Sequence, residues 1–309
     1  MASRSVPRGV AGRLCRFETK DGLELNGFLA EPLGRKTRTC LVHVHGWDGN
    51  FYENRFIDHA ARAAVSLGLG FFAFNNRGHD YIADILRPRT GDYLQLGGIY
   101  ERLSDCLPDI RAALDFLKAQ GYSRIVLQGH SHGAIKAGWF VSQTQDPRVV
   151  GLVLLSPSDD LAWAQKLMGR RFQPALARAR RLVQAGRARQ LLPADLFPYP
   201  VSAGTFLDSF APDSVTGMFN LSQTVRKSFP ELAAISVPIL LVVGTKEEAF
   251  TLSPAQFVAA ARQAATSTHS FTGHVLKGAP HNYLGHERPL ATLLRQWLTA
   301  RQKEWQRHD

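Results

Sequence analysis

The chain has 309 residues, of which 45% are hydrophobic and 20% are charged, and this composition argues against a disordered or a collagen-like protein. Its net charge of +11 would suit an anionic partner such as nucleic acid or anionic lipid. Much of the excess charge, however, lies in one arginine-rich segment, residues 170–190. We interpret this segment as an amphipathic helix with a solvent-exposed basic face, the alternative being an anion-binding role.

The cysteines and the N-terminal residues bear on the compartment. Cys15, Cys40 and Cys106 form no Cys-x-x-Cys pair, which speaks against a disulfide framework and against a thiolate zinc site. Residues 1–14 carry arginines but no apolar stretch of signal-peptide length, and no stretch reaches the roughly 18 apolar residues of a membrane span. We therefore expect a cytoplasmic protein that does not associate with membranes.

In chain order, residues 14–32 come first and contain two alternating stretches around Asp21-Gly22, which is typical of a two-residue hairpin turn. Five later runs are short and almost continuously apolar, as expected of strands buried on both faces of a parallel sheet. These runs are residues 40–46, 68–76, 124–130, 149–157 and 237–245. Helical patterns cover residues 52–67, 103–119, 132–144, 253–265 and 287–305. Such alternation predicts an α/β fold with a mostly parallel central sheet and helices on both faces.

One long segment breaks this alternation. Residues 157–232 lack a strong strand pattern and hold the arginine-rich segment together with Pro193, Pro198 and Pro200. We interpret 157–232 as a mainly helical cap inserted over the strand ends. The core domain is then formed by residues 1–156 and 233–309.

The segment Gly129-His130-Ser131-His132-Gly133 lies where a strand is expected to turn directly into a helix. A serine hydroxyl is a poor nucleophile at neutral pH and needs a base, a group that orients the base, and donors for the oxyanion. In a parallel sheet such groups meet at the carboxyl ends of strands. A sharp turn there strains the central residue and leaves no room for a Cβ at the flanking positions, which explains the two glycines. Ser131 is therefore the candidate nucleophile, and a purely structural tight turn is the alternative.

With this G-x-S-x-G turn in place, the sequence resembles the α/β-hydrolase fold family of serine hydrolases over nearly the whole chain outside the cap. Members carry a His-Gly pair after an early strand, which matches His45-Gly46 here. The resemblance implies an oxyanion hole formed by the backbone N–H groups of Trp47 and His132, the latter at a helix N-terminus. For His43 and His45 the alternatives are packing on one face of a strand or a metal site, and no carboxylate partner at ligand spacing supports the metal site. We expect neither a metal nor another cofactor.

The family places its catalytic histidine in a loop after the last strand. This region of the chain holds His274, His281 and His286. His274 falls inside the expected strand, whereas His281 follows a strand-like run and Gly278-Ala279-Pro280, which we interpret as a turn. His281 is therefore the candidate base, and His286 is its competitor.

The family's acid usually stands three residues beyond the glycine of the strand at 238–244, and Glu247 occupies that position. Its neighbour Glu248 is one alternative. Asp159 and Asp160, after the preceding strand, are others, although either can instead cap a helix that begins directly after them.

Four further residues are expected to have supporting roles. His130 and His132 need no chemical role if His281 is the base, so we interpret them as packing groups around the turn. Arg77-Gly78 resembles a pair that ends a strand in many hydrolases of this fold, and we interpret it as organising a loop by hydrogen bonds rather than contacting substrate.

A serine at the turn disfavours dehalogenase and epoxide hydrolase chemistry, because those family members need an aspartate nucleophile there. The order Ser131, Glu247, His281 agrees with the fold, so we predict a serine hydrolase that cleaves a carboxylic ester or lactone through an acyl-enzyme. A thioesterase, an amidase or a C–C bond hydrolase is the alternative, and a non-catalytic basic binding protein is a more distant one.

The cap is expected to select the substrate, a small molecule rather than nucleic acid. Its arginines suggest an acidic group on that molecule. Its aromatic residues suit either an apolar pocket wall or an ordinary core; they are Trp163, Phe172, Phe197, Tyr199 and Phe206. The sequence leaves the oligomeric state open, a homodimer included.

Overall fold

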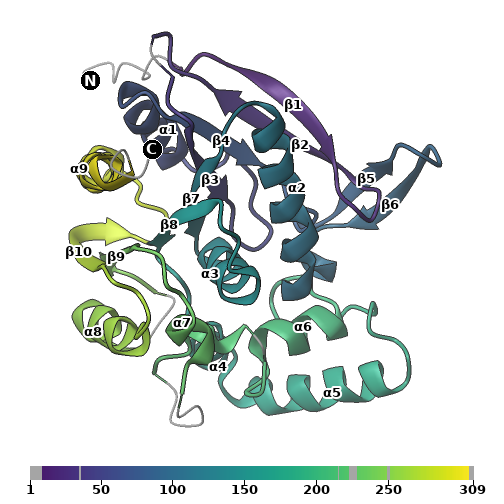
Figure 1. The fold of residues 1–309 in the computed structure, drawn as a ribbon. Coiled ribbons are helices and arrows are strands. Elements are labelled where there is room, and N and C mark those ends of the chain that lie inside the picture. The colour runs from purple at the N-terminus through teal and green to yellow at the C-terminus, as the bar shows by residue number, and fades with distance from the viewer. Residues whose placement is uncertain (1–8, 35, 215, 223–227, 249–250, 306–309) are drawn as a thin grey trace, which may run out of the picture.

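The computed structural model describes residues 9–34, 36–214, 216–222, 228–248 and 251–305. At its centre lies an eight-stranded sheet in the order β1-β2-β4-β3-β7-β8-β9-β10 (Figure 1). The strands are β1 Gly12–Glu18, β2 Glu24–Ala30, β3 Thr39–Val44, β4 Gly70–Phe74, β7 Arg124–His130, β8 Val149–Leu155, β9 Ile239–Lys246 and β10 Phe271–Pro280. Pairing is antiparallel from β1 through β2 to β4 and parallel between all the other neighbours, as the sequence predicted.

The five apolar runs correspond to β3, β4, β7, β8 and β9. Every residue of β3 and of β4 is buried, because helices cover both faces of the sheet.

The expected two-residue turn at Asp21-Gly22 is wrong in length. Glu18 pairs with Glu24, and the backbone N–H of Thr19 bonds to the Leu23 carbonyl at 2.8 Å, so the loop inside the ladder is longer.

Helices on the two faces of the sheet bury two separate apolar cores. One face carries α1 Phe56–Ser66 and α9 Glu287–Trp305, and the other carries α2 Cys106–Ala119, α3 His132–Thr144 and α8 Pro254–Ala264 (Figure 1). The expected bounds are correct for α3, whereas α1 begins four residues later than predicted. Side-chain hydrogen bonds engage the backbone N–H groups of residues that were expected to belong to α1. Asn75 Oδ1 accepts from the N–H of Phe51, and Asn50 Oδ1 accepts from the N–H of Tyr52.

A hairpin outside the central sheet, β5 Ala83–Arg87 with β6 Asp92–Leu96, was not anticipated from the sequence. It extends from the side of the molecule near β1 and β2 (Figure 1).

Between β8 and β9 the described residues form four α-helices. They are α4 Asp160–Met168, α5 Phe172–Gln184, α6 Ala203–Phe210 and α7 Pro230–Ala233. The first three, which belong to the segment interpreted as the cap, pack around an apolar core of their own that includes Phe172, Phe197 and Phe206. Three of the aromatic residues noted in the sequence therefore serve as ordinary cap core.

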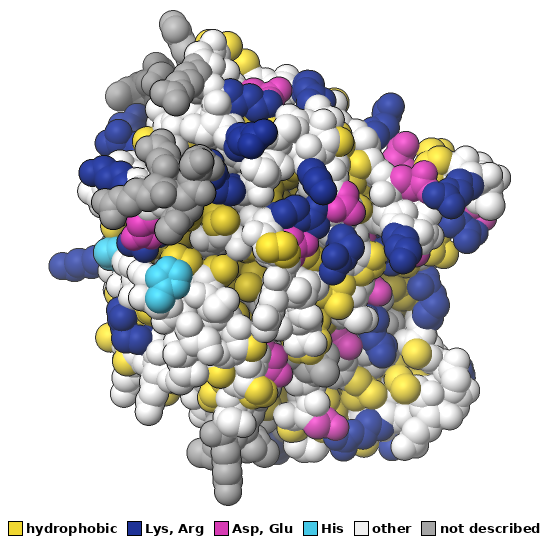
Figure 2. Space-filling view, viewed as in Figure 1, with side chains coloured by type: hydrophobic (Ala, Val, Ile, Leu, Met, Phe, Trp, Pro, Cys, Tyr) yellow, Lys and Arg dark blue, Asp and Glu magenta, His cyan; other side chains and the backbone are white. Residues whose placement is uncertain are grey.

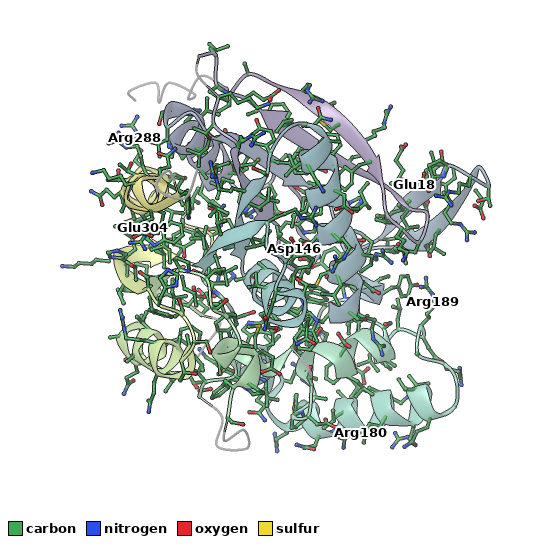
Figure 3. The ribbon with its side chains drawn as sticks, in the orientation of Figure 1. Glu18, Asp146, Arg180, Arg189, Arg288 and Glu304 are labelled. Carbon is green, nitrogen blue, oxygen red and sulfur yellow. The ribbon has the colours of Figure 1, made fainter. Side chains whose placement is uncertain are left out.

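The arginines of residues 170–190 lie on the surface of the cap, as the amphipathic pattern predicted. Arg180 lies on the outer side of α5, 3.7 Å from the Asp213 carboxylate (Figure 3). Arg189 stacks over the Tyr100 ring at 3.7 Å from its centroid and donates to the Gln95 carbonyl at the end of β6. The basic face of α5 is thus exposed, and Arg180 on it and Arg189 after it each have a structural partner.

The composition raised the questions of a membrane span, a disulfide framework and a metal site. Within the described ranges, none of the helices combines the length and the apolar content needed to cross a bilayer. Cys15, Cys40 and Cys106 are buried and free. In the same part of the chain, no three His, Cys, Asp or Glu side chains gather in a way that could hold a metal ion.

Candidate active site

Ser131 occupies the sharp turn between β7 and α3, with φ 57° and ψ −130°. A Cβ on Gly129 would lie 2.0 Å from the Gly133 carbonyl oxygen, and one on Gly133 would lie 2.3 Å from the Val44 carbonyl oxygen. Both positions therefore require glycine, as predicted. The Ser131 N–H donates to the Leu155 carbonyl at 2.9 Å, which ties the turn to the end of β8.

Glu247 and His281 meet at the ends of the last two parallel strands. His281 Nδ1 lies 2.6 Å from Glu247 Oε1, with the glutamate side chain fully buried and the imidazole 32% exposed. An Nδ1–H that donates to this carboxylate leaves Nε2 as the proton acceptor. Ser131 and His281 line one cavity, so the structure brings the three predicted residues to the same place.

The strand register explains why these two residues meet. Pro280 at the end of β10 pairs with Lys246 at the end of β9, so the next residue of each strand lies beside the other. The expected turn at Gly278-Ala279-Pro280 is wrong, because β10 continues through it. Instead the register shifts between Leu276 and Pro280, and Gly278 adopts φ 79° while its N–H donates to Thr245 Oγ1.

The alternative acids have other partners. The Asp159 side chain caps α4 by accepting from the Ala162 N–H at 3.0 Å. Asp160 Oδ2 lies 3.0 Å from His132 Nδ1, which connects the first residue of α4 to the nucleophile turn. Glu248 has an exposed side chain at the rim of the cavity. None of these contacts involves His281.

The competing histidine contacts its own loop. His286 is half-buried, and its Nδ1 lies 3.4 Å from the Leu284 carbonyl. It is not among the described residues that line the cavity.

His130 holds the backbone of the candidate base. Its Nε2–H donates to the His281 carbonyl at 2.8 Å, and burial lowers the pKa of His130 well below its usual value, so the ring is neutral. Tyr283, two residues after His281, is buried and donates its hydroxyl proton to the Val242 carbonyl at 2.7 Å. The packing role predicted for His130 therefore includes a specific hydrogen bond to the loop of His281.

The Gly46–Trp47 peptide is fixed through its carbonyl group. Gly46 O lies 2.8 Å from His45 Nδ1 and 3.3 Å from Lys136 Nζ. The Asn76 N–H donates to His45 Nε2 at 3.1 Å, so the ring proton is on Nδ1 and donates to Gly46 O. Because a trans peptide directs C=O and N–H to opposite sides, the held carbonyl aims the Trp47 N–H away from Lys136. This arrangement suits the predicted oxyanion donor.

The Gly46 backbone also lies close to the nucleophile. A Cβ on Gly46 would lie 3.2 Å from the Ser131 Cβ, and Trp47 and His132 both line the cavity. His132 is the first residue of α3, where backbone N–H groups lack intrahelical acceptors and favour negative charge. Both predicted oxyanion donors therefore belong to the lining of the same cavity.

A buried ion pair behind this peptide was missed in the sequence. Lys136 Nζ lies 2.6 Å from Glu101 Oε1, with the two side chains 0% and 3% exposed. A Cβ on Gly78 would approach the Glu101 carboxyl carbon to 2.1 Å, which explains that glycine. The available signal was a lysine within the otherwise small and apolar run of residues 133–138.

Removing the Lys136 charge should reduce catalysis. Lys136→Met leaves the Glu101 carboxylate buried and unpaired, which should cost about 3–5 kcal/mol of unfolding free energy. The double variant with Glu101→Gln should recover much of that stability, whereas its kcat should stay about tenfold low at similar KM, because the carbonyl of Gly46 has lost a donor. Thermal unfolding and steady-state kinetics on one ester measure both quantities. A double variant with wild-type kcat would mean that the pair only stabilises the fold.

Arg77 has a structural role, in line with its interpretation as a loop organiser. It binds the buried Asp109 through Nε and Nη2 and Asp21 through both terminal nitrogens, with distances of 2.7 to 3.0 Å. The guanidinium holds the pKa of Asp21 below its usual value despite the opposing effect of burial.

His43 and His45 show no feature of a metal site. Gln128 Nε2 lies 2.9 Å from His43 Nδ1, and the Phe56 ring packs edge-on against the imidazole. Burial lowers the pKa of His43 to about 3, so the ring is neutral. Packing and hydrogen bonding therefore account for both histidines.

The cavity has a volume of about 340 Å³. Its lining includes the rings of Trp47, Trp163 and Phe210, and four carboxylic acids, Asp48, Glu53, Asp160 and Glu248. No lysine or arginine occurs among the described residues that line it. The cap arginines, on which the expectation of an acidic substrate group rested, lie on the surface and are not among these lining residues.

The chain was compared with known protein families and structures. Residues 41–296 match the family model described as the alpha/beta hydrolase family. The chain belongs to this family. The resemblance drawn from the motifs and the predicted fold are both confirmed. Among curated proteins no match was found.

Several solved structures share the fold of this alpha/beta hydrolase. Est1E from Butyrivibrio proteoclasticus, with ferulic acid bound, has a TM-score of 0.65 at 19% identity, covering 93% of this chain and 98% of that one. The siderophore hydrolase EstB from Aspergillus fumigatus has a TM-score of 0.69 at 16% identity, covering 96% and 99%. An esterase from Pyrococcus furiosus has a TM-score of 0.59 at 15% identity, covering 94% and 93%. At these identities the likeness concerns the fold alone.

Proposed function

We propose that this alpha/beta hydrolase cleaves a carboxylic ester or lactone through an acyl-enzyme on Ser131. The observation that carries the proposal is the buried Glu247 carboxylate, 2.6 Å from the imidazole of His281, which lines the same cavity as the strained Ser131. A serine, a histidine that can act as its base, and a carboxylate that orients the histidine ring form the arrangement that nucleophilic catalysis requires.

In the proposed first half of the cycle, His281 Nε2 takes the proton of the Ser131 hydroxyl as its oxygen attacks the ester carbonyl. The negative charge on the former carbonyl oxygen is stabilised by the N–H groups of Trp47 and His132. The tetrahedral intermediate collapses, and the imidazolium gives its proton to the leaving alcohol. Glu247 retains the Nδ1 proton and stabilises the positive charge on the ring.

In the second half, water attacks the acyl-enzyme and transfers a proton to His281, and the acid product leaves as Ser131 recovers its proton. Proteins of similar structure support this class of reaction: one is an esterase, one is a siderophore hydrolase, and one holds ferulic acid.

A pre-steady-state burst tests the proposed function. Rapid mixing with a p-nitrophenyl ester should release up to one equivalent of p-nitrophenol per enzyme before the slower steady state, provided that deacylation limits turnover. A panel of matched lactones, thioesters and anilides then distinguishes the bond type. Absence of turnover on every ester and lactone, together with cleavage of thioesters or amides, would replace the proposed reaction by one of its alternatives.

A further inference from the structure

The charge inside the cavity differs from that of the whole molecule. The chain carries a net +11, and Figure 2 shows Lys and Arg side chains spread over much of the visible face. The described cavity lining has the opposite character, with Asp48, Glu53, Asp160 and Glu248 and no basic side chain other than histidine. These carboxyl groups come from three separate parts of the chain: the loop after β3, the start of α4 and the loop after β9.

Three of the four acids are available to a ligand. Asp160 is bound to His132 at 3.0 Å. In the part of the chain that the structure describes, Asp48, Glu53 and Glu248 form no ion pair. Asp48 is half-buried, and the Tyr81 phenol hydrogen-bonds to it. Burial raises the pKa of Asp48 to about 6, with a smaller contribution from Glu53, so a cation beside it would be stabilised by an incompletely compensated charge.

Aromatic rings form another part of the same cavity wall. The Trp47 and Phe210 rings meet edge-on with centroids 6.2 Å apart, and the Trp163 ring lies 5.8 Å from Phe210. Aromatic faces attract cations electrostatically, most strongly where water is excluded. A neutral substrate would use the rings alone, and an anionic one would be repelled by the carboxylates, whereas a cation gains from both.

The size of the cavity restricts where the charge can lie. At about 340 Å³ it is at the lower end of small-molecule sites, which are roughly 300–1,000 Å³. The carboxylates and the rings share this space with Ser131 and His281. A charged group that reaches them must therefore belong to the same small molecule as the scissile bond.

On the basis of the function proposed above, we propose that the substrate carries a positively charged ammonium group within a short chain of its ester or lactone bond. The carboxylates of Asp48, Glu53 and Glu248 and the rings of Trp47, Trp163 and Phe210 form the site that receives it. The enzyme is thereby selective for amino esters over neutral and acidic esters of the same length.

Three p-nitrophenyl esters of equal length test this selectivity: 6-aminohexanoate, heptanoate and adipate monoester, which end in an ammonium, a methyl and a carboxylate group. We expect kcat/KM to fall in that order, with about a tenfold preference for ammonium over methyl at low salt that weakens as the salt concentration rises. Equal or faster cleavage of heptanoate at every salt concentration would overturn the proposal.

Variants that each remove one carboxylate test whether the cavity residues cause the preference for the ammonium ester. Glu53→Gln, Asp48→Asn and Glu248→Gln should each lower the ratio of kcat/KM for aminohexanoate over heptanoate. The control Asp84→Asn removes an exposed carboxylate on β5, outside the cavity, and should leave the ratio unchanged. A ratio that falls equally in the control would assign the preference to charges outside the cavity. Turnover of heptanoate with no ammonium preference rejects this inference alone, whereas no turnover of any of the three esters counts against the proposed function.

Discussion

Ser131→Ala should lower kcat on an ester substrate by about four to six orders of magnitude, because alanine has no oxygen to form the acyl-enzyme. The residual rate would come from the oxyanion donors and from substrate binding. The fold should be preserved, since alanine also has a Cβ and meets the same backbone strain at φ 57°. Steady-state kinetics give the rate, and thermal unfolding gives the stability.

Contamination by a host esterase is the main confounder of this measurement, so wild type and variant need identical purification. A variant that keeps more than about a tenth of the wild-type kcat would assign the chemistry to another group, because loss of a true nucleophile costs far more. Gly129→Ala is unsuitable as a control, since its Cβ would lie 2.0 Å from the Gly133 carbonyl oxygen and would disturb the turn itself.

Glu247→Gln should lower kcat by about 10⁴ with little change in KM, because an amide no longer fixes the proton on His281 Nδ1 or stabilises the imidazolium. Two matched variants separate the candidate acids. Glu248→Gln removes an exposed carboxylate and should have a small effect on a neutral ester. Asp160→Asn removes the negative charge 3.0 Å from His132 Nδ1 and should have an intermediate effect on kcat.

The comparison of these three variants identifies the acid directly. If Asp160→Asn lowers kcat as strongly as Glu247→Gln does, the orienting carboxylate lies on the cap side of the cavity, contrary to the 2.6 Å contact of Glu247 with His281. Kinetics on one neutral ester, with unfolding measured in parallel, are sufficient.

The parts of the fold that local patterns determine were predicted from the sequence. Strands buried on both faces leave continuous apolar runs, so β3, β4, β7, β8 and β9 were recognisable. The turn at Ser131 was recognisable because Gly129 and Gly133 flank the serine in the sequence. A Cβ on Gly129 would meet the Gly133 carbonyl oxygen, and one on Gly133 would meet that of Val44 on β3. Glu247 was found by its spacing from the β9 glycine, and the pairing of Pro280 with Lys246 explains why that spacing places it beside His281.

Features that depend on distant parts of the chain were not predictable in this way. The ion pair of Lys136 with Glu101 joins residues 35 positions apart, and neither residue stands in a recognised motif. The register shift near Gly278 arises from the pairing of β10 with β9, which the local sequence does not reveal. Gly278-Ala279-Pro280 was therefore interpreted as a turn. The net charge of +11 describes the whole chain and does not indicate which charges line the cavity, where the described residues include four carboxylic acids.

Covalent labelling with a fluorophosphonate tests the role of Ser131 most directly. Incubation of the folded protein, followed by intact mass measurement and peptide mapping, should show one adduct per chain on Ser131. Heat-unfolded protein should not react, since the hydroxyl then lacks its base. A folded protein that acquires no adduct, or acquires it at another residue, would contradict the account.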